Sequence, residues 1–317
     1  MDFSPNQNAL RLCAAAVANA VDLGIELVYE DNNLGLIDFG VQVDGSLEAG
    51  QLLARICLSD LGTVELGNFS SPPLQNVAVE TGQPLWACMG SQYAGWQIQH
   101  PGFFGMGSGP VRLRRGSEKV LLEYALREET DEAVLVLESR ALPSHEILTQ
   151  LREGFSPDLR RLIVCVAPTQ SIAGTLQIVA RSVESVCHKL HELKFDLRAI
   201  QRGRGVAPLL LTSPEEPEAE MLAMGRCNDA ILLGGAVVLQ VDCADALIEQ
   251  IGPRAPSCAS PQFGVPFAQL LRDVHGDFYR LDPLLFAPAC IEFQNHRSGN
   301  TFRYGELRWD LLPDLST

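Results

Sequence analysis

Three consecutive segments decide the fold class of this chain: AVLVLES (133–139), SHEILTQLREGF (144–155) and RRLIVCVAP (160–168). The first and third are short, almost wholly apolar runs, which predicts strands buried on both faces. The middle segment spaces its apolar residues as an amphipathic helix does. This order predicts a βαβ unit, and with it α/β or α+β layering of helices on sheets.

Strand and helix patterns also alternate on either side of this unit. Apolar spacing predicts helices at 8–23, 47–62, 84–96 and 244–252. Apolar and β-branched runs predict strands at 25–31, 33–41, 63–69, 76–81, 291–295 and 301–308. The glycine pair in ILLGGAVVLQVD (231–242) predicts a further hairpin.

The strongest helix signal covers residues 170–194. Its apolar side chains recur at steps of four and three over three heptads. They are Ile172, Leu176, Val179, Val183, Val186, Leu190 and Leu193. Pro168 ends the preceding strand, and Thr169 or Ser171 can cap the start of the helix.

Composition narrows the class of protein. A chain of 317 residues with 46% hydrophobic content can bury a large core. Its net charge of −15 argues against nucleic-acid binding, because phosphate contacts need an excess of lysine and arginine. No apolar run reaches the ~18 residues of a membrane span, and no basic region precedes an apolar stretch as in a signal peptide. We therefore expect a cytoplasmic protein with a small-molecule ligand.

The nine cysteines are scattered along the chain, which predicts reduced thiols and no disulfide framework. No CxxC pair occurs, which argues against a cysteine-based zinc site.

The chain divides into three predicted parts, 1–115, 116–211 and 212–317. The last begins at an acidic, proline-containing segment, TSPEEPEAEM (212–221), that predicts a linker or loop.

A polar face lies opposite the apolar stripe of helix 170–194. It consists of Gln177, Arg181, Glu184, His188 and His191. Arg181 and Glu184 are three residues apart and can touch, so Arg181 can hold an ionised carboxylate as a general base or water-positioning group requires. The same spacing also produces ordinary surface ion pairs, which contribute only ~0.3–0.5 kcal/mol. A metal site built from Glu184, His188 and His191 is a weaker alternative, since no HExxH motif or second ligand cluster accompanies it.

A glycine-rich loop is expected at 103–115. Its core GMGSGP (105–110) lets backbone amides approach a ligand, or simply makes a tight turn. The candidate binding residues there are Gly105, Gly107, Ser108 and Gly109. A cluster of arginines follows, which either meets an anionic ligand group or forms a solvated edge. The cluster consists of Arg112, Arg114 and Arg115.

Two polar motifs in the C-terminal third flank predicted core elements. Asn228 and Asp229 belong to GRCNDA, and Asp277 and Phe278 belong to GDFY. Polar and aromatic groups in such positions suit the edge of a ligand. Asparagine and aspartate also cap loops, and that interpretation stays open.

Six blocks of the chain resemble the methenyltetrahydromethanopterin cyclohydrolase family. They are GSLEAGQLLARICLSDLGTVEL (45–66), GSQYAGWQI (90–98), GMGSGPVR (105–112), APTQSIAGTLQIVARSVE (167–184), MGRCNDAILLGG (224–235) and FGVPFAQLLRDVHGDFYRLDPLLFAPA (263–289). The resemblance covers nearly the whole chain. It implies a two-domain α/β fold peculiar to the family, a pterin cleft between the domains and a homotrimer.

The resemblance also implies a reaction. The family's catalytic arginine and glutamate map onto Arg181 and Glu184, which would open the methenyl bridge of the carrier to the 5-formyl form without a cofactor or metal ion. Tyr93 stands where archaeal members carry a lysine, so SQYAGW is similar to the bacterial branch, whose carrier is dephosphorylated. The alternatives are a non-catalytic pterin-binding protein and a zinc hydrolase that uses Glu184, His188 and His191.

Overall fold

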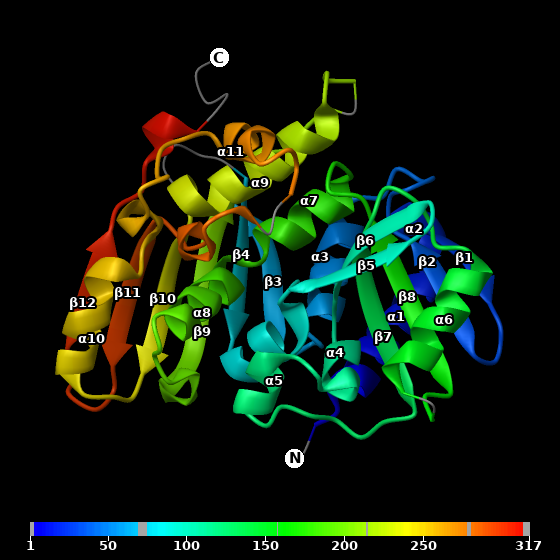
Figure 1. Cartoon of the computed structure of the whole chain (residues 1–317), viewed down its shortest axis with the longest axis horizontal. Coiled ribbons are helices and arrows are strands. Elements are labelled where there is room, and N and C mark those ends of the chain that lie inside the picture. Colours follow the sequence, from blue (N-terminus) through cyan, green and yellow to red (C-terminus); the bar gives the residue numbers. More distant parts are fainter. Residues whose placement is uncertain (1–2, 69–74, 157, 214, 278–279, 313–317) are drawn as a thin grey trace. The chain divides into compact units, whose positions relative to one another are not determined.

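A computed structural model describes residues 3–68, 75–156, 158–213, 215–277 and 280–312. The chain forms two units that interleave along the sequence, unit 1 from Met1–Gly62 and Trp86–Gln177, and unit 2 from Thr63–Leu85 and Ile178–Thr317. Each unit is built on a six-stranded sheet (Figure 1). The predicted two-domain α/β class is confirmed. Because the units interleave, each draws on more than one of the three predicted consecutive parts.

The sheet of unit 1 has the strand order β1-β2-β8-β7-β6-β5. Its strands are β1 (Glu26–Glu30), β2 (Leu34–Asp38), β5 (Trp96–His100), β6 (Phe103–Ser108), β7 (Glu132–Glu138) and β8 (Arg161–Ala167). β2, β8 and β7 run parallel, and α6 (His145–Phe155) connects β7 to β8. The βαβ unit predicted from the sequence is therefore confirmed.

Helices cover both faces of this sheet. Unit 1 also contains α1 (Pro5–Ala18), α2 (Ala20–Leu23), α3 (Leu47–Cys57), α4 (Val111–Arg115), α5 (Lys119–Glu123) and most of α7 (Ile172–Val179). Val134 and Val136 of β7 pack with residues of α1 and α3 on one face, whereas Leu135 packs with residues of α6 on the other. Burial on both faces explains why the parallel strands are continuously apolar.

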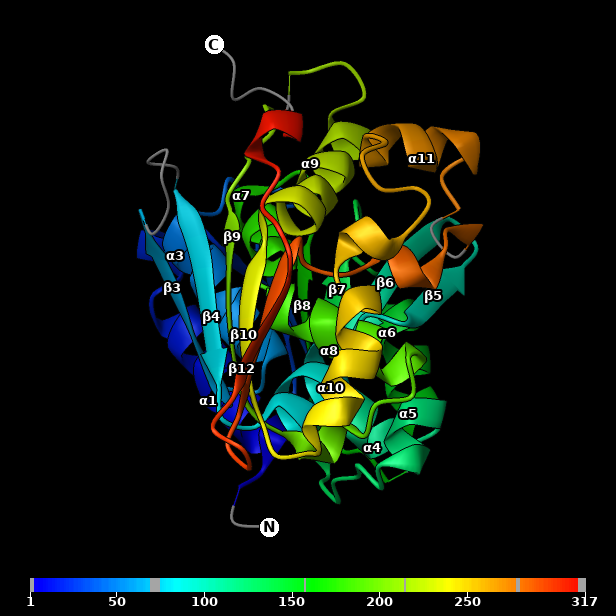
Figure 2. The same cartoon turned by 90° about the vertical axis from the view of Figure 1, so that its left-hand side faces the viewer.

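The sheet of unit 2 has the strand order β12-β11-β10-β9-β4-β3. Its strands are β3 (Gly62–Gly67), β4 (Asn76–Thr81), β9 (Ile200–Pro208), β10 (Ala236–Val241), β11 (Cys290–Asn295) and β12 (Thr301–Gly305). Its α-helices are α8 (Ser182–Glu192), α9 (Ala219–Gly234), α10 (Asp245–Ile251) and α11 (Phe267–Asp273). Figure 2 shows this sheet close to edge-on, with α8 and α10 on the same side.

Three predicted elements outside helix 170–194 and the glycine-rich segment 103–115 differ in the structure. The predicted hairpin at 231–242 is wrong, because its first half is the last turn of α9 and only its second half is a strand, β10. The apolar run ILLGG has no period that separates a buried helix from a strand. The segment predicted as a helix at 84–96 forms the π-helix η1 (Leu85–Gln92) and then enters β5. The predicted helix 8–23 is interrupted at Asn19, between α1 and α2.

Two glycines of β9 let α8 approach the sheet closely. Gly203 and Gly205 alternate with arginines in RGRGV, and the positions where their side chains would begin face α8. A Cβ built on Gly203 would lie 2.6 Å from Cγ1 of Val183, and one built on Gly205 would lie 2.2 Å from Oγ of Ser182. Real Cβ atoms do not approach other atoms this closely, so these positions hold α8 against the sheet only as glycine.

We expect Gly205→Ala to lower the free energy of unfolding by about 1–3 kcal/mol, because the added methyl group forces α8 away from β9. Urea denaturation measures the effect. Gly82→Ala is the matched control in the same unit, since no atom lies within 4 Å of its built Cβ. Combining Gly205→Ala with Ser182→Ala should recover part of the loss, because it removes the clashing hydroxyl. An unchanged stability of Gly205→Ala would contradict this account of the packing.

Candidate active site

Arg181 and Glu184 lie at the N-terminal end of α8. The predicted continuous helix 170–194 is interrupted there, with α7 (Ile172–Val179) before the break and α8 after it. Arg181 adopts φ −92° and ψ 11° at the break, in a sparsely populated region of backbone space that active-site residues often occupy. No glycine or proline marks this position. The pair is thus held at a helix terminus and not in the middle of a helix.

The position of Glu184 suits a negative charge. Glu184 lies in the first turn of α8, where unsatisfied backbone N–H groups and the helix dipole favour anions. Arg181 and Glu184 are each only 7% exposed, and neither is without a partner. An ion pair on a solvated face, which the spacing also allowed, is therefore not what the structure contains. Removing such groups from water costs several kcal/mol per ion, which their partners must offset.

The other members of the predicted polar face are also largely shielded from solvent. Gln177 is buried at the end of α7, and His191 is buried in the last turn of α8. Burial lowers the pKa of His188, so its imidazole is neutral at pH 7. The apolar side chains from Leu176 to Leu193 are buried as predicted, and so is Cys187. Within the described parts of the chain, no group of three or more His, Cys, Asp or Glu side chains is arranged to hold a metal ion.

Tyr93 directly follows the π-helix η1 in unit 1. Its backbone N–H donates to the carbonyl oxygen of Cys88, five residues earlier, so the π-type bonding continues to this residue. Its ring lies over Gly95, where a built Cβ would be 2.5 Å from the ring atom Cε1. π-Helical turns occur frequently at functional sites. The backbone and the neighbouring glycine together fix the ring of Tyr93.

Arg112 supplies a cation next to Tyr93. Its guanidinium carbon lies 5.1 Å from the centre of the tyrosine ring, within cation–π range. The guanidinium pairs with Glu118 and donates to the carbonyl oxygen of Met89 at 2.9 Å. Arg112 is fully buried. The expectation that this arginine meets a ligand or a solvated edge is therefore wrong, because it supports η1 and the ring of Tyr93.

The other two arginines of the cluster also have partners in unit 1. Arg114 pairs with Glu129 and Asp158, with nitrogen–oxygen distances of 3.1 and 2.6 Å. The guanidinium of Arg115 lies 4.6 Å from the ring of Trp96. The cluster as a whole stabilises unit 1, and its ligand-binding interpretation has no support in these contacts.

The predicted glycine-rich loop is largely a strand. Gly105, Gly107 and Ser108 belong to β6, which pairs antiparallel with β5 and β7. A Cβ on Gly107 would lie 2.5 Å from the ring of Trp96, and Gly109 has φ +91° with Val136 close by. The sequence cue failed because glycines that pack under an aromatic ring look the same as glycines of a loop. Packing accounts for Gly107 and Gly109, and contact of this segment with a ligand stays a prediction.

Asn228 and Asp229 lie on α9 and not in a loop. The side-chain amide of Asn228 donates to the carbonyl oxygen of Met224, one helical turn earlier. The carboxylate of Asp229 accepts from the backbone N–H of Phe267 at 3.1 Å, at the start of α11. Asp277 is exposed, and Phe278 lies outside the described residues. Asp229 therefore caps a neighbouring helix and not a loop, and ligand contacts of these four residues stay predictions.

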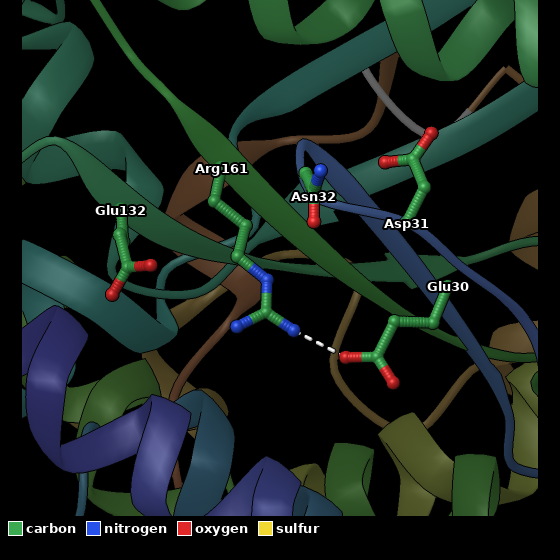
Figure 3. A pocket seen from close by; sticks show the side chains of 5 residues that line it. All are labelled: Glu30, Asp31, Asn32, Glu132 and Arg161. Atoms are coloured by element: carbon green, nitrogen blue, oxygen red, sulfur yellow. Dashed lines mark hydrogen bonds and ion pairs between the residues drawn. The ribbon is translucent and has the colours of Figure 1, made fainter.

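Sequence reasoning did not identify an open pocket in unit 1. It has a volume of about 430 Å³ and is lined by Glu30, Asp31, Asn32, Glu132 and Arg161. Figure 3 shows the ion pair that joins Arg161 to Glu30 across it. Glu132 and Arg161 are the first residues of the parallel strands β7 and β8. Ligands of parallel sheets bind at the opposite, carboxyl ends of the strands, so this acidic pocket is not our candidate site.

The family model described as Cyclohydrolase (MCH) matches residues 4–314. The chain belongs to this family. It is 40% identical over 282 residues to the methenyltetrahydromethanopterin cyclohydrolase of Rhodopirellula baltica, covering 87% of this chain and 84% of the relative. It is 38% identical to the same-named protein of Methylobacillus flagellatus, covering 98% and 94%. An archaeal relative from Methanosarcina barkeri, of the same name, is 36% identical and covers 92% and 91%.

We expect the stability of this cyclohydrolase-family protein to depend on the ionisation of Asp229. Burial raises the pKa of Asp229 to about 7, against the lowering effect of the Phe267 hydrogen bond, whereas the unfolded value is ~3.9. The folded state therefore binds this proton more tightly, and the contribution of Asp229 to stability falls as the pH rises from ~4 through 7. The substitution Asp229→Asn keeps an acceptor oxygen at this position and removes the titrating group.

The difference in unfolding free energy between Asp229→Asn and wild type should therefore shift in favour of the variant between pH 5 and pH 8. The expected shift is roughly 1–3 kcal/mol, since one proton contributes ~1.4 kcal/mol per pH unit. Urea denaturation at both pH values measures it. An equal difference at pH 5 and pH 8 would show that Asp229 does not titrate in this range.

Proposed function

We propose that this protein hydrolyses the methenyl bridge of methenyl-tetrahydromethanopterin, or of its dephosphorylated form, to the 5-formyl carrier, and that the reaction is reversible. The observation that carries the proposal is the buried Arg181 and Glu184 at the N-terminus of α8, in a chain of the cyclohydrolase family. The names of the bacterial and archaeal relatives support the same reaction.

The proposed chemistry needs an aimed water molecule and a base. The methenyl carbon lies between two nitrogens as an amidinium-like cation and is already electrophilic. Water adds to this carbon, a C–O bond forms, and one proton of the water passes to Glu184. The C–N bond to one nitrogen then breaks, the hydroxyl proton of the adduct passes to that nitrogen, and the oxygen becomes the formyl carbonyl. Glu184 releases its proton to solvent at the end of the cycle.

Arg181 and Tyr93 would have supporting roles. Arg181 holds the Glu184 carboxylate in its ionised form and in a fixed orientation, which a planar guanidinium does better than an ammonium group. Tyr93 stands in place of the archaeal lysine, and Arg112 gives it a cationic neighbour that is shielded from the ligand by the ring.

We also propose, from the family resemblance, that the protein is a cytoplasmic homotrimer. Among the described residues no helix is both long and apolar enough to cross a membrane.

The sharpest test is Glu184→Gln, which keeps the shape of the side chain but removes the base. We expect kcat to fall by roughly 10²–10⁴-fold while the protein still folds and binds carrier. Arg181→Lys should lose less, because it keeps the charge and loses only the planar fork. Glu192→Gln, at the other end of α8, is the matched control and should stay near wild type. Loss of the methenyl chromophore in the ultraviolet measures the rate.

A Glu184→Gln variant within about threefold of wild type in kcat would refute the role of Glu184 as the base. The same result in Arg181→Lys alone would leave that role intact, because the lysine ammonium can still neutralise the carboxylate. Circular dichroism and carrier binding of each variant separate a lost base from a lost fold.

We expect turnover to survive exhaustive chelation, because the charge of the substrate itself activates the carbon and water needs only a base. The measurement is the hydrolysis rate before and after dialysis against EDTA. Complete loss of activity that zinc restores would instead favour the zinc-hydrolase alternative with Glu184, His188 and His191.

A further inference from the structure

A small cavity in unit 2 lies beside α8 and away from the proposed base. Its volume is about 100 Å³, which is the share of about three water molecules in the liquid. It is formed where the C-terminal half of α8 meets three short 3-10 helices, η3 (Gly252–Arg254), η4 (Ser257–Ala259) and η6 (Pro283–Leu285). The lining residues are Lys189, Leu193, Arg254, Ala259, Ser260, Pro261, Asp282 and Leu284.

Buried Lys189, exposed Arg254 and buried Ser260 bring more hydrogen-bond donors to the cavity than the described residues supply acceptors for. Lys189 is only 2% exposed, and of its three N–H groups one donates to the carbonyl oxygen of Leu284. Arg254 has five N–H groups, and none bonds to any part of the chain that the structure describes. The Ser260 oxygen accepts from the N–H of Gln262 at 3.3 Å, which leaves its own proton to donate.

Acceptors are scarce in the same place. Asp282 is the one carboxylate of the lining, and one of its oxygens is engaged with the backbone N–H of Leu284 at 2.9 Å. Neither Lys189 nor Arg254 forms an ion pair with it within the described residues. With two cationic side chains and one carboxylate, the lining of the cavity has a net positive charge, although the chain as a whole has a net charge of −15. An oxyanion supplies the acceptors and the charge that this arrangement lacks.

The cavity is separate from the proposed catalytic pair. Lys189 follows Glu184 by five residues, which on an α-helix is a rise of ~7.5 Å and a rotation of roughly 140°. The two side chains therefore leave α8 on different sides. A ligand in the cavity would not occupy the position of the water that Glu184 activates.

We propose that this cavity binds a small free oxyanion such as phosphate or sulfate, held by Lys189, Arg254 and Ser260.

The burial of Lys189 makes the affinity of this site for an anion depend on pH. Burial lowers the pKa of Lys189 to about 8, partly offset by Asp282, and Arg254 lowers it further. The anion needs the protonated ammonium, so its affinity falls as the pH rises through 8. Asp282, Arg254, Cys258 and His188 are charged or titratable groups that interact with Lys189.

Isothermal titration of the full-length protein with sulfate, in chloride buffer of constant ionic strength, tests the proposal. Sulfate does not titrate between pH 7 and 9, so changes with pH report on the protein. We expect saturable binding at pH 7 that weakens in Lys189→Met and in Arg254→Gln by roughly 10–100-fold, as the loss of a charge-assisted bond predicts. Arg198→Gln, which removes an exposed arginine of the same unit, is the matched control and should bind as wild type.

The pH dependence gives a second, independent readout. Sulfate affinity should fall between pH 7 and pH 9 in the wild type and equally in Cys258→Ser, because the proposal assigns the pH dependence to Lys189. Lys189→Met should lose this pH dependence. Thermal unfolding shows whether each variant is folded, and Lys189→Met should be at least as stable as wild type because it no longer buries an ammonium group.

Several outcomes overturn the proposal. No saturable sulfate binding in the wild type, or equal affinity in wild type, Lys189→Met and Arg254→Gln, would exclude this anion site. A rise in KM for the carrier in both variants, with no change in kcat and no sulfate binding, would assign the cavity to an anionic end of the carrier. Failure of this site leaves the test of Glu184 untouched, because sulfate binding is measured without turnover.

Discussion

The close approach of α8 to strand β9 is the constraint on which the candidate site depends. Gly203 and Gly205 remove the side chains that would otherwise separate helix and sheet. The apolar side of α8 then packs against the sheet, and its N-terminus takes a fixed position. Arg181 and Glu184 lie at that terminus. A methyl group added at either glycine would push the helix away from the sheet and move both residues. The proposed reaction requires its catalytic groups to be placed to well under 1 Å, and Gly203 and Gly205 contact the residues that lie between Arg181 and Glu184.

Buried charges recur in this protein, and each is stabilised in a different way. Arg112 combines an ion pair, a carbonyl acceptor and the face of Tyr93. Asp229 has one backbone donor, so its charge is poorly compensated and its pKa rises. Lys189 has one carbonyl acceptor and a lowered pKa for the same reason. The groups with few partners are the ones that titrate near neutral pH, and they are therefore the ones that experiments can detect.

Much of the fold could be predicted because the signals were strong and local. Continuous apolar runs marked β7 and β8, and the heptad-like stripe marked the helices that carry Arg181 and Glu184. The break at Arg181 could not be predicted, because no glycine or proline marks it and the apolar period continues across it. The glycine-rich pattern of β6 was misinterpreted for a similar reason, since Gly107 accommodates the ring of Trp96, a residue that only the strand pairing brings near.

The candidate site was predictable in part. The spacing of Arg181 and Glu184 was visible, but their burial depends on tertiary packing that sequence spacing does not contain. The Arg112 contact with Tyr93 joins residues that are separated by β5 and β6, so no local pattern reveals it. The cavity at Lys189 could not be predicted from the sequence for the same reason, because Arg254 and Asp282 come from separate short turns. Helix faces can be read from sequence, whereas the convergence of distant turns cannot.

In the proposed reaction, a pairing of Glu184 with Arg181 would have an electrostatic purpose beyond orientation. The methenyl substrate is a cation, and its charge disappears as water adds to the carbon. A lone carboxylate would attract that cation most strongly before the reaction, and this would stabilise the ground state more than the transition state. A guanidinium beside the carboxylate cancels most of the net charge of the pair, so the attraction for the cation is weaker while the carboxylate oxygen remains available to take the proton. The pair can therefore act as a base without holding the substrate back, which a single buried glutamate could not do.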